Sequence, residues 1–429
     1  CNFFVSIQRP EMIRLAYMTW ATLFPMRADS EPKQYIVYIP EWQETERQIL
    51  VFPEISTTVV LGSDYYGESK KGFLRMAMWN AKQKDMLGLH AGSKVVKAKG
   101  SDGRIKRYGM LIFGMSGTGK TTHTCHTHGL SDTDEGIEIL QDDVVFLKKD
   151  GSAYGSERGF YLKTEGLDPV TQPIIYKAAT SRDAIFENVM IDYEGNLYFE
   201  DDTLTSNGRG IMMREDLGPY ISNSINLPPV NEMDGLIVAF ITRRHTVVPL
   251  AVKLTPEQAA AVFMLGESIE TSAGDPKRAG ESIREVGTNP FIIGDKSYEG
   301  NWFYDFVKRH EGKVRCYQLN TGGLGEIIEK QPNGARVFKR KVQRVEIPEM
   351  SSIIRGITRG TNKWSKDKYW NVEVPTSVQG MDISKYNVEK FYDVDDIIKQ
   401  VSDLRLERAE YLEKFNTLDK AIINAAKTM

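Results

Sequence analysis

The chain has 429 residues, of which 41% are hydrophobic and 26% are charged. This composition is typical of an ordinary globular protein with two domains, or with one domain and a substantial extension. The net charge of -3 argues against a general attraction to nucleic acid or anionic membranes. Cys1, Cys125 and Cys316 are far apart and odd in number, so we predict no disulfide framework and a reducing, cytoplasmic location.

Residues 1–62 form a region of mixed α/β pattern. The runs 35–38 (YIVY) and 48–52 (QILVF) predict strands. The apolar stretch 15–26 is too short to span a bilayer, and it lacks the basic start and the small-residue cleavage site of a signal peptide. We therefore expect no membrane segment here.

Two adjacent lysines, Lys70 and Lys71, follow a glycine turn in residues 64–73 (DYYGESKKGF), near the start of a helix predicted to end before Gly88. Neighbouring ammonium groups repel each other, and a helix N-terminus disfavours positive charge, so both effects lower a lysine pKa. A lysine that loses its proton can act as a base or as a metal ligand. The alternative is a solvated surface pair.

His90 lies in residues 87–93 (LGLHAGS), which predict a short strand, and residues 94–107 predict a polar hairpin after it. A single histidine in an apolar, glycine-rich strand is either a hydrogen-bonded core residue or a metal ligand. The pattern leaves both interpretations open.

The strongest local signal lies in residues 108–122 (YGMLIFGMSGTGKTT). Residues 114–121 match G-x-x-x-x-G-K-[ST] at every position, and the apolar run 110–113 before them is typical of a buried strand. In such a loop backbone N–H groups point at phosphate oxygens, the lysine reaches the terminal phosphates, and the hydroxyl can bind Mg2+. We therefore predict a phosphate-binding loop with Lys120 and Thr121 in these two roles. The alternative is an ordinary glycine-rich turn.

Histidines are concentrated directly after this loop, and Cys125 lies among them. If His123, His126 and His128 continue a helix, His123 and His126 share one face while Cys125 and His128 turn to the other. The four side chains then cannot converge on zinc, so packing or solvent contact is expected.

Asp142 and Asp143 interrupt the predicted strand 137–147 (IEILQDDVVFL). Apolar residues on both sides argue against an exposed acidic turn. Carboxylates placed beyond a phosphate-binding loop hold the hydrated cation in many nucleotide enzymes, so we predict a metal role for this pair.

The later elements are predicted from simple patterns. Residues 236–242 (LIVAFIT) predict a central strand, and residues 255–270 predict a helix that Thr255 caps. Residues 395–415 predict a charged amphipathic helix. The basic run 336–344 (RVFKRKVQR) alternates with apolar residues, which favours an exposed strand over a nucleic-acid patch.

Taken together, the motifs resemble those of ATP-dependent phosphoenolpyruvate carboxykinase. Their order is Tyr-Gly-Glu-x-Lys-Lys-Gly, a histidine nineteen residues on, Gly-Met-Ser-Gly-Thr-Gly-Lys-Thr-Thr, and then Asp-Asp. The similarity continues in later segments and covers nearly the whole chain from about residue 3. These segments are 185–189 (IFENV), 205–209 (TSNGR), 248–255 (VPLAVKLT), 319–322 (LNTG) and 374–382 (VPTSVQGMD).

This resemblance implies an α/β fold with a mixed-sheet, P-loop nucleotide-binding catalytic domain at 86–429. An N-terminal α/β substrate domain at 1–85 would be truncated, since the family's early substrate-binding arginine would lie upstream of Cys1. The implied reaction converts oxaloacetate and ATP to phosphoenolpyruvate, CO2 and ADP in gluconeogenesis, with Mg2+ and Mn2+. The implied partners are small molecules, without nucleic acid or membrane, and a monomer is favoured.

The resemblance also assigns site residues by position. Lys71, His90 and Asp143 would hold Mn2+, and Thr121 would contact the Mg2+ of ATP. Tyr65, Lys70, Ser116 and Arg209 would face the substrate carboxylates and the transferring phosphate. The residues implied to bind the nucleotide are Gly117, Thr118, Gly119, Lys120, Thr121, Thr122, Asp142, Glu157, Lys163 and Arg344.

Three departures from the family pattern concern the organic substrate and the adenine. Tyr66 replaces the first of two glycines and would put a ring where backbone should approach the substrate. Residues 144–146 (VVF) replace polar residues, and Met350 replaces a threonine expected near the adenine. Two alternatives follow: a divergent kinase with another acceptor, or an ATP-sensing protein without turnover. The retained Lys71, His90, Asp143 and Arg209 argue against the sensor.

Overall fold

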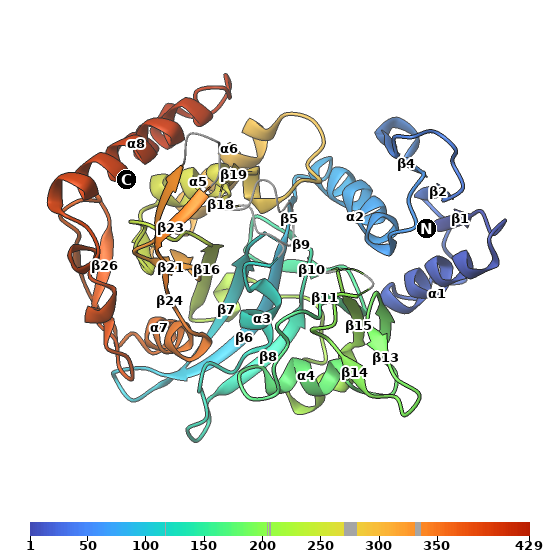
Figure 1. The fold of residues 1–429 in the computed structure, drawn as a ribbon, viewed down its shortest axis with the longest axis horizontal. Helices are drawn as coiled ribbons and strands as arrows, with labels where there is room; N and C mark the ends of the chain where they lie inside the picture. Colours follow the sequence, from blue (N-terminus) through green and yellow to red (C-terminus); the bar gives the residue numbers. More distant parts are fainter. Residues whose placement is uncertain (116, 204, 206, 270–280, 331–335) are drawn as a thin grey trace.

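The structure, a computed structural model, describes residues 1–115, 117–203, 205, 207–269, 281–330 and 336–429. Ser116 therefore lies outside the described residues. Figure 1 shows a large central sheet, with the N-terminal segment on one side and the last long helix on the other. Among the described residues no helix is both long and apolar enough to cross a membrane.

The central sheet is mixed, as the resemblance implies. Its neighbours β7, β16 and β20 run parallel, and all its other pairings are antiparallel. The strand order is β25 (Lys363–Lys366), β26 (Glu373–Ser377), β17 (Ala251–Leu254), β20 (Val314–Asn320), β16 (Gly235–Thr242), β7 (Ile105–Phe113), β6 (Ala91–Lys99) and β8 (Gly136–Gln141). Every residue of β16 is buried, which confirms the predicted central strand.

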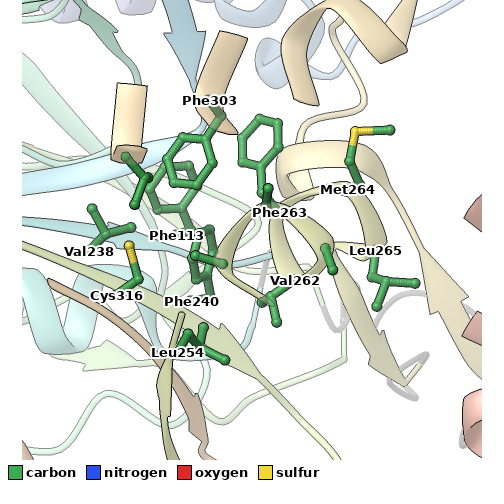
Figure 2. Close-up of a cluster of buried hydrophobic side chains, with 14 of the residues drawn as sticks. Phe113, Val238, Phe240, Leu254, Val262, Phe263, Met264, Leu265, Phe303 and Cys316 are labelled. Carbon is green, nitrogen blue, oxygen red and sulfur yellow. The ribbon is translucent and has the colours of Figure 1, made fainter. Parts of the chain in front are cut away.

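Both faces of this sheet are covered, because successive side chains of a strand point to opposite faces. On β7, Leu111 and Phe113 pack in one core and Met110 and Ile112 in another. Figure 2 shows the first core, where Phe113 and Phe240 of the sheet meet aromatic rings of two helices. The rings of Phe263 and Phe303 are stacked with centroids 4.8 Å apart. This double burial makes the strand that leads to the phosphate-binding loop a rigid support.

The helices lie around the central sheet, except for the first two, which lie on the side of the N-terminal segment (Figure 1). They are α1 (Ile13–Thr22), α2 (Tyr66–Lys82), α3 (Lys120–Cys125), α4 (Pro173–Ala179), α5 (Pro256–Leu265), α6 (Lys296–Arg309), α7 (Ile347–Arg359), α8 (Val394–Leu412) and α9 (Lys420–Thr428). Short 3-10 turns are η1 (Pro10–Met12), η2 (Pro53–Ile55), η3 (Arg214–Tyr220), η4 (Val230–Glu232), η5 (Val286–Thr288), η6 (Ile383–Tyr386) and η7 (Val388–Lys390). The predicted C-terminal helix 395–415 is confirmed as α8.

The N-terminal segment forms its own sheet, against which α2 packs. The strand order is β1 (Asn2–Val5), β2 (Tyr35–Ile39), β4 (Thr57–Leu61) and β3 (Gln48–Phe52), so both predicted strands are confirmed. The outer side of α1 exposes apolar residues, among them Tyr17 and Trp20, whose rings stack.

The remaining strands form small sheets. One orders β10 (Ala153–Gly155), β9 (Val145–Leu147) and β5 (Leu87–Leu89), and another orders β11 (Gly159–Lys163), β15 (Arg209–Met213) and β12 (Ile185–Glu187). The pairs are β13 (Met190–Ile191) with β14 (Leu197–Tyr198), β18 (Glu267–Ile269) with β19 (Ser282–Arg284), β21 (Gly323–Leu324) with β24 (Gln343–Arg344), and β22 (Ile327–Lys330) with β23 (Arg336–Arg340).

Several elements differ from their predicted extents. The predicted strand 137–147 is split into β8 of the central sheet and β9 of a small sheet, and α8 ends at Leu412 rather than at residue 415. The helix predicted at 255–270 begins as expected with a capping box between Thr255 and Gln258, but it ends at Leu265 because Gly266 adopts a left-handed φ of 43°. The single strand predicted at 87–93 is two strands of different sheets, β5 and β6. His90 lies at the break between them, which directs its side chain toward the loop region.

Candidate active site

The predicted phosphate-binding loop joins β7 to α3. Its glycines are required locally: Gly117 and Gly119 have left-handed φ values of 78° and 103°, and a Cβ on Gly114 would lie 2.5 Å from the Thr118 hydroxyl oxygen. Thr118 donates a 2.8 Å hydrogen bond to the carbonyl oxygen of Met115, which closes the turn. The strand, loop and helix occur in the predicted order.

A cavity of about 430 Å³ opens at this loop. It brings together most of the residues that the sequence singled out. Those that line it are Tyr65, Lys71, His90, Gly117, Thr118, Gly119, Lys120, Thr121, Thr122, Asp143, Lys163, Arg209 and Arg344. The expected metal ligands and the expected phosphate contacts therefore share one cavity.

Asp143 is the centre of charge in this cavity. Its carboxylate accepts from Lys70 Nζ at 2.8 Å, lies 3.1 Å from His90 Nε2, and pairs with the ammonium of Lys120. Burial alone would raise its pKa, but the ammonium groups of Lys120 and Lys70 hold the pKa of Asp143 well below its usual value. Asp143 is therefore an anion and a strong candidate ligand for a cation.

His90 is oriented by a second hydrogen bond. Its Nδ1 lies 2.6 Å from the carbonyl oxygen of Thr288, which can only accept, so Nδ1 carries a hydrogen, and Nε2 lies 3.1 Å from Asp143 Oδ1, where both atoms could bind one cation. Burial, reinforced by the charge of Lys120, lowers the pKa of His90. The ring is thus neutral and is both hydrogen-bonded in the core and aimed at the cavity.

Lys71 faces the cavity with its Nζ 5.0 Å from the ring centroid of Phe291. Burial, aided by the charge of Lys70, lowers the pKa of Lys71 to about 8 although Asp143 opposes this shift. The predicted direction is thus correct, but burial exceeds the repulsion between the two lysines. An amine with a lowered pKa, whose proton a metal ion can displace, an imidazole and a carboxylate form a donor set that fits a divalent transition-metal ion. His, Cys, Asp and Glu alone form no such set of three among the described residues.

Asp142 lies next to the loop hydroxyl. Thr121 Oγ1 donates to Asp142 Oδ2 at 2.9 Å, while the buried Oδ1 has no hydrogen-bond partner. Burial raises the pKa of Asp142 to about 6. An unpartnered buried carboxylate oxygen beside a threonine hydroxyl fits a hydrated cation.

Lys70 and Glu157 lie behind the cavity wall, although the resemblance implied that both contact ligands. The Lys70 ammonium is buried between Asp143 and Glu157, 3.2 Å from Glu157 Oε1. Burial opposes its charge, but these two carboxylates raise the pKa of Lys70 above its usual value. Asp142 is likewise not among the described residues that line the cavity. The two lysines therefore differ in role: Lys71 faces the cavity and Lys70 orients Asp143.

Tyr65 and Arg209 also line the cavity, and both lie near the ring of Tyr161. The ring of Tyr65 lies over Gly67, where a Cβ would come within 2.4 Å of Tyr65 Cε1. Arg209 has its Cζ 5.8 Å from the ring centroid of Tyr161 and donates through Nε to Asn207 Oδ1 at 3.0 Å. A phenol and a guanidinium in one cavity can bind carboxylate or phosphate oxygens.

Comparison with known proteins gives the family. A family model described as phosphoenolpyruvate carboxykinase matches residues 30–384, and a phosphoenolpyruvate carboxykinase (ATP) of Aeropyrum pernix is 34% identical over 93% of this chain and 75% of its own length. The chain belongs to the ATP-dependent phosphoenolpyruvate carboxykinase family.

Carboxykinases of this name from two other organisms are more distant. The Rhodopseudomonas palustris protein is 26% identical over 85% of this chain, and the Leptospira biflexa protein is 27% identical over 84%. This chain spans 66% and 63% of their respective lengths.

The departures from the carboxykinase pattern have structural explanations. The expectation for Tyr66 was wrong: its ring is fully buried, its hydroxyl lies 2.6 Å from Thr22 Oγ1, and it packs edge-on against Tyr161, away from the cavity. Val144 is buried in a small core with Phe291. Met350 lines the cavity, so this departure does alter a wall.

The expected arrangement of the histidines was also wrong. Because α3 ends at Cys125, His126 and His128 are not on the helix. The rings of His123, His126 and His128 instead gather beside Lys94, a residue that the sequence did not single out.

Other cavity residues were missed, among them Arg243, Glu165 and Gln172. Arg243 directly follows β16, and the carboxyl ends of parallel strands are where α/β sheets bind ligands. That position was a usable signal. No sequence pattern indicated Gln172, because the residue that it contacts, Thr122, lies 50 positions earlier in the chain. Thr122 Oγ1 donates to Gln172 Oε1 at 2.8 Å.

Proposed function

We propose that this protein converts oxaloacetate and ATP to phosphoenolpyruvate, CO2 and ADP. The observation that carries the proposal is one cavity lined by the phosphate-binding loop, by the donor set Lys71, His90 and Asp143, and by Arg209. In detail, Thr121 and Asp142 would hold the Mg2+ that accompanies ATP, and the donor set would hold Mn2+.

The geometry suits the two parts of this reaction. Cleavage of a carbon–carbon bond releases CO2 and leaves its electron pair on an enolate oxygen, which then attacks the terminal phosphorus of ATP as ADP departs. A bound divalent cation supplies electrostatic stabilisation of developing negative charge. Lys120 and Arg209, which line the cavity, would neutralise the transferring phosphoryl group, and Tyr65 would orient the substrate carboxylates.

The proposal includes the organisation of the molecule. Residues 1–85 would serve the organic substrate, and residues 86–429 would bind the nucleotide and carry out the reaction. We further propose a cytoplasmic monomer that acts on small molecules in gluconeogenesis and binds neither nucleic acid nor membranes. One cavity is lined by Tyr65 and Lys71 from the first region and by Lys120 from the second. This supports a site to which both regions contribute.

The test is an assay for CO2 release and phosphoenolpyruvate formation with oxaloacetate, ATP, Mg2+ and Mn2+. Arg209→Ala should lower kcat much more than ATP affinity, because its charge is needed in the transition state. Lys120→Ala should instead weaken ATP binding by about 2 kcal/mol, the loss of a charge-assisted hydrogen bond. A protein that consumes ATP with another acceptor but never forms phosphoenolpyruvate would overturn the proposal.

A further inference from the structure

A buried lysine lies beneath the phosphate-binding loop. Lys94 of β6 is fully buried, and within the described parts of the chain no carboxylate forms an ion pair with it. Its Nζ donates instead to the carbonyl oxygens of His123 at 2.6 Å and His126 at 2.9 Å. These carbonyls lie at the C-terminal end of α3, where a cation is favoured. Lys94 thus ties the helix that begins at Lys120 to the central sheet.

The same ammonium starts a polar chain that reaches the cavity. Lys94 Nζ lies 3.3 Å from His128 Nδ1, and His128 Nε2 lies 3.4 Å from His123 Nδ1. The ring centroids of the two histidines are 5.6 Å apart, which is farther than these two nitrogens are from each other. His123 lines the cavity, and its Nε2 lies 3.9 Å from the position that a Cβ on Gly119 would take.

The protonation state of Lys94 determines which nitrogens of the two histidines donate hydrogen bonds and which accept them. A charged ammonium can only donate, so His128 Nδ1 must accept, His128 Nε2–H donates to His123 Nδ1, and His123 is left with a hydrogen on Nε2. A neutral amine can accept instead. The order then reverses, and His123 presents a lone pair beside Gly119. A phosphate oxygen is attracted by the first arrangement and repelled by the second.

We propose that Lys94 is a positioning residue of the ATP site, which fixes the end of α3 and, through His128, holds the Nε2–H of His123 toward the phosphate-binding loop. This inference rests on the proposed function in that it takes ATP as the ligand. It adds a pH dependence to ATP binding beyond the one that Asp142 and Lys71 contribute by their own charges.

Lys94 is the member of this cluster that changes charge near neutral pH. Burial lowers the pKa of Lys94 to about 7, that of His123 to about 3 and that of His126 to about 4, and it holds the pKa of His128 well below its usual value. Burial also keeps the Cys125 thiol protonated by raising its pKa. The groups that face the cluster are Cys125 and His123 of α3, His126 and His128 after it, and Arg355 of α7, which donates to the His128 carbonyl oxygen at 3.2 Å.

Calorimetry with MgATP at pH 6, 7 and 8 tests the inference. Affinity should fall about tenfold between pH 6 and 8, the loss of one hydrogen bond to a charged group. Lys94→Met should bind weakly at pH 6 and lose this dependence. His123→Gln, whose amide can present an N–H to the phosphate at either pH, should lose this dependence as well. Since the titration of ATP itself is common to all three proteins, the differences between them isolate Lys94.

Nitrogen-15 NMR of the histidine rings gives a readout without nucleotide. His123 should carry its hydrogen on Nε2 at pH 6 and on Nδ1 at pH 8, with a midpoint near the pKa of Lys94. An unchanged tautomer across this range, or wild-type affinity and pH dependence in a folded Lys94→Met protein, would overturn the inference. Should Lys94→Met fail to fold, a full pH dependence retained by His123→Gln would overturn it equally. A wild-type protein that switches tautomer but binds no ATP would refute the proposed function instead.

Discussion

Tyr66 is a residue whose substitution separates packing from catalysis. Its ring is buried beside Tyr161 and its hydroxyl contacts Thr22, so Tyr66→Gly should destabilise the fold by about 3–5 kcal/mol without raising activity toward oxaloacetate. Chemical denaturation and the activity assay measure the two effects. Tyr66→Phe, which removes the hydroxyl alone, is the matched control and should cost about 1 kcal/mol. Increased turnover in Tyr66→Gly would show that the ring narrows the cavity after all.

Gly67 allows the expected position of Tyr65. A methyl group at Gly67 would collide with the Tyr65 ring, so Gly67→Ala should displace that ring from the cavity wall. We expect KM for oxaloacetate to rise about tenfold, with ATP affinity unchanged, since a displaced contact costs on the order of 1.4 kcal/mol. Tyr65→Phe is the control for the hydroxyl alone. Equal losses in the affinity for ATP would mean that the whole loop region had moved.

For single residues, the sequence indicated a role where the role follows from a local motif. It did not indicate the orientation or the pKa of side chains that depend on residues far away in the chain. Lys120 and Thr121 follow from their own motif. The direction of Tyr66 depends on Thr22, 44 positions away, and no local pattern contains that contact. The opposite pKa shifts of Lys70 and Lys71 likewise depend on burial and on Asp143, which only tertiary structure supplies.

At the scale of elements, a buried carboxylate joins the last long helix to the sheet region. Glu267 of β18 accepts from Arg408 of α8 at 2.8 Å and from Arg284 of β19 at 3.1 Å. Arg408 also donates to the carbonyl oxygen of Met429 at 3.2 Å. The C-terminal helices are therefore held to the rest of the chain by a charged cluster as well as by apolar packing.

This cluster predicts an acid-sensitive stability. Burial alone would raise the pKa of Glu267, but Arg408 and Arg244 hold it well below its usual value. The stabilisation is thus complete above the unfolded pKa of about 4.3 and is lost as pH falls toward the lower folded pKa. Denaturation at pH 7 and below pH 4 should show this loss. Glu267→Gln should cost about 3–5 kcal/mol at pH 7 and flatten the pH dependence; an unchanged pH profile would exclude the cluster as its source.

The extents of elements were predicted well where the terminating signal is local. Thr255 and Pro256 begin α5 as expected, but its end at Leu265 was missed, because Gly266 could have been a glycine tolerated inside a longer helix. The end of α3 at Cys125 was missed for a similar reason: Lys94, which binds its terminal carbonyls, lies on a strand 29 positions earlier than His123.

At the scale of the whole molecule, the family and the mixed sheet could be predicted because ordered motifs survive along the chain. The assembly of the cavity could not. Its walls come from α2, the loop, β15 and the segment before α7, and their convergence is a property of the fold. Arg243 and Arg344 both line the cavity although they are far apart in the sequence, and no local pattern relates one position to the other.

The ion pair between Lys120 and Asp143 has a consequence for the sequence of binding events. Lys120 pairs with the carboxylate that the proposed function assigns to a cation. ATP would draw Lys120 toward its phosphates and release Asp143, so nucleotide and cation should each tighten the binding of the other by the same factor. Mn2+ titrations with and without a non-hydrolysable ATP analogue should show this synergy, and Lys120→Ala should abolish it. Lys120 would then disfavour cation binding at Asp143 until ATP is bound.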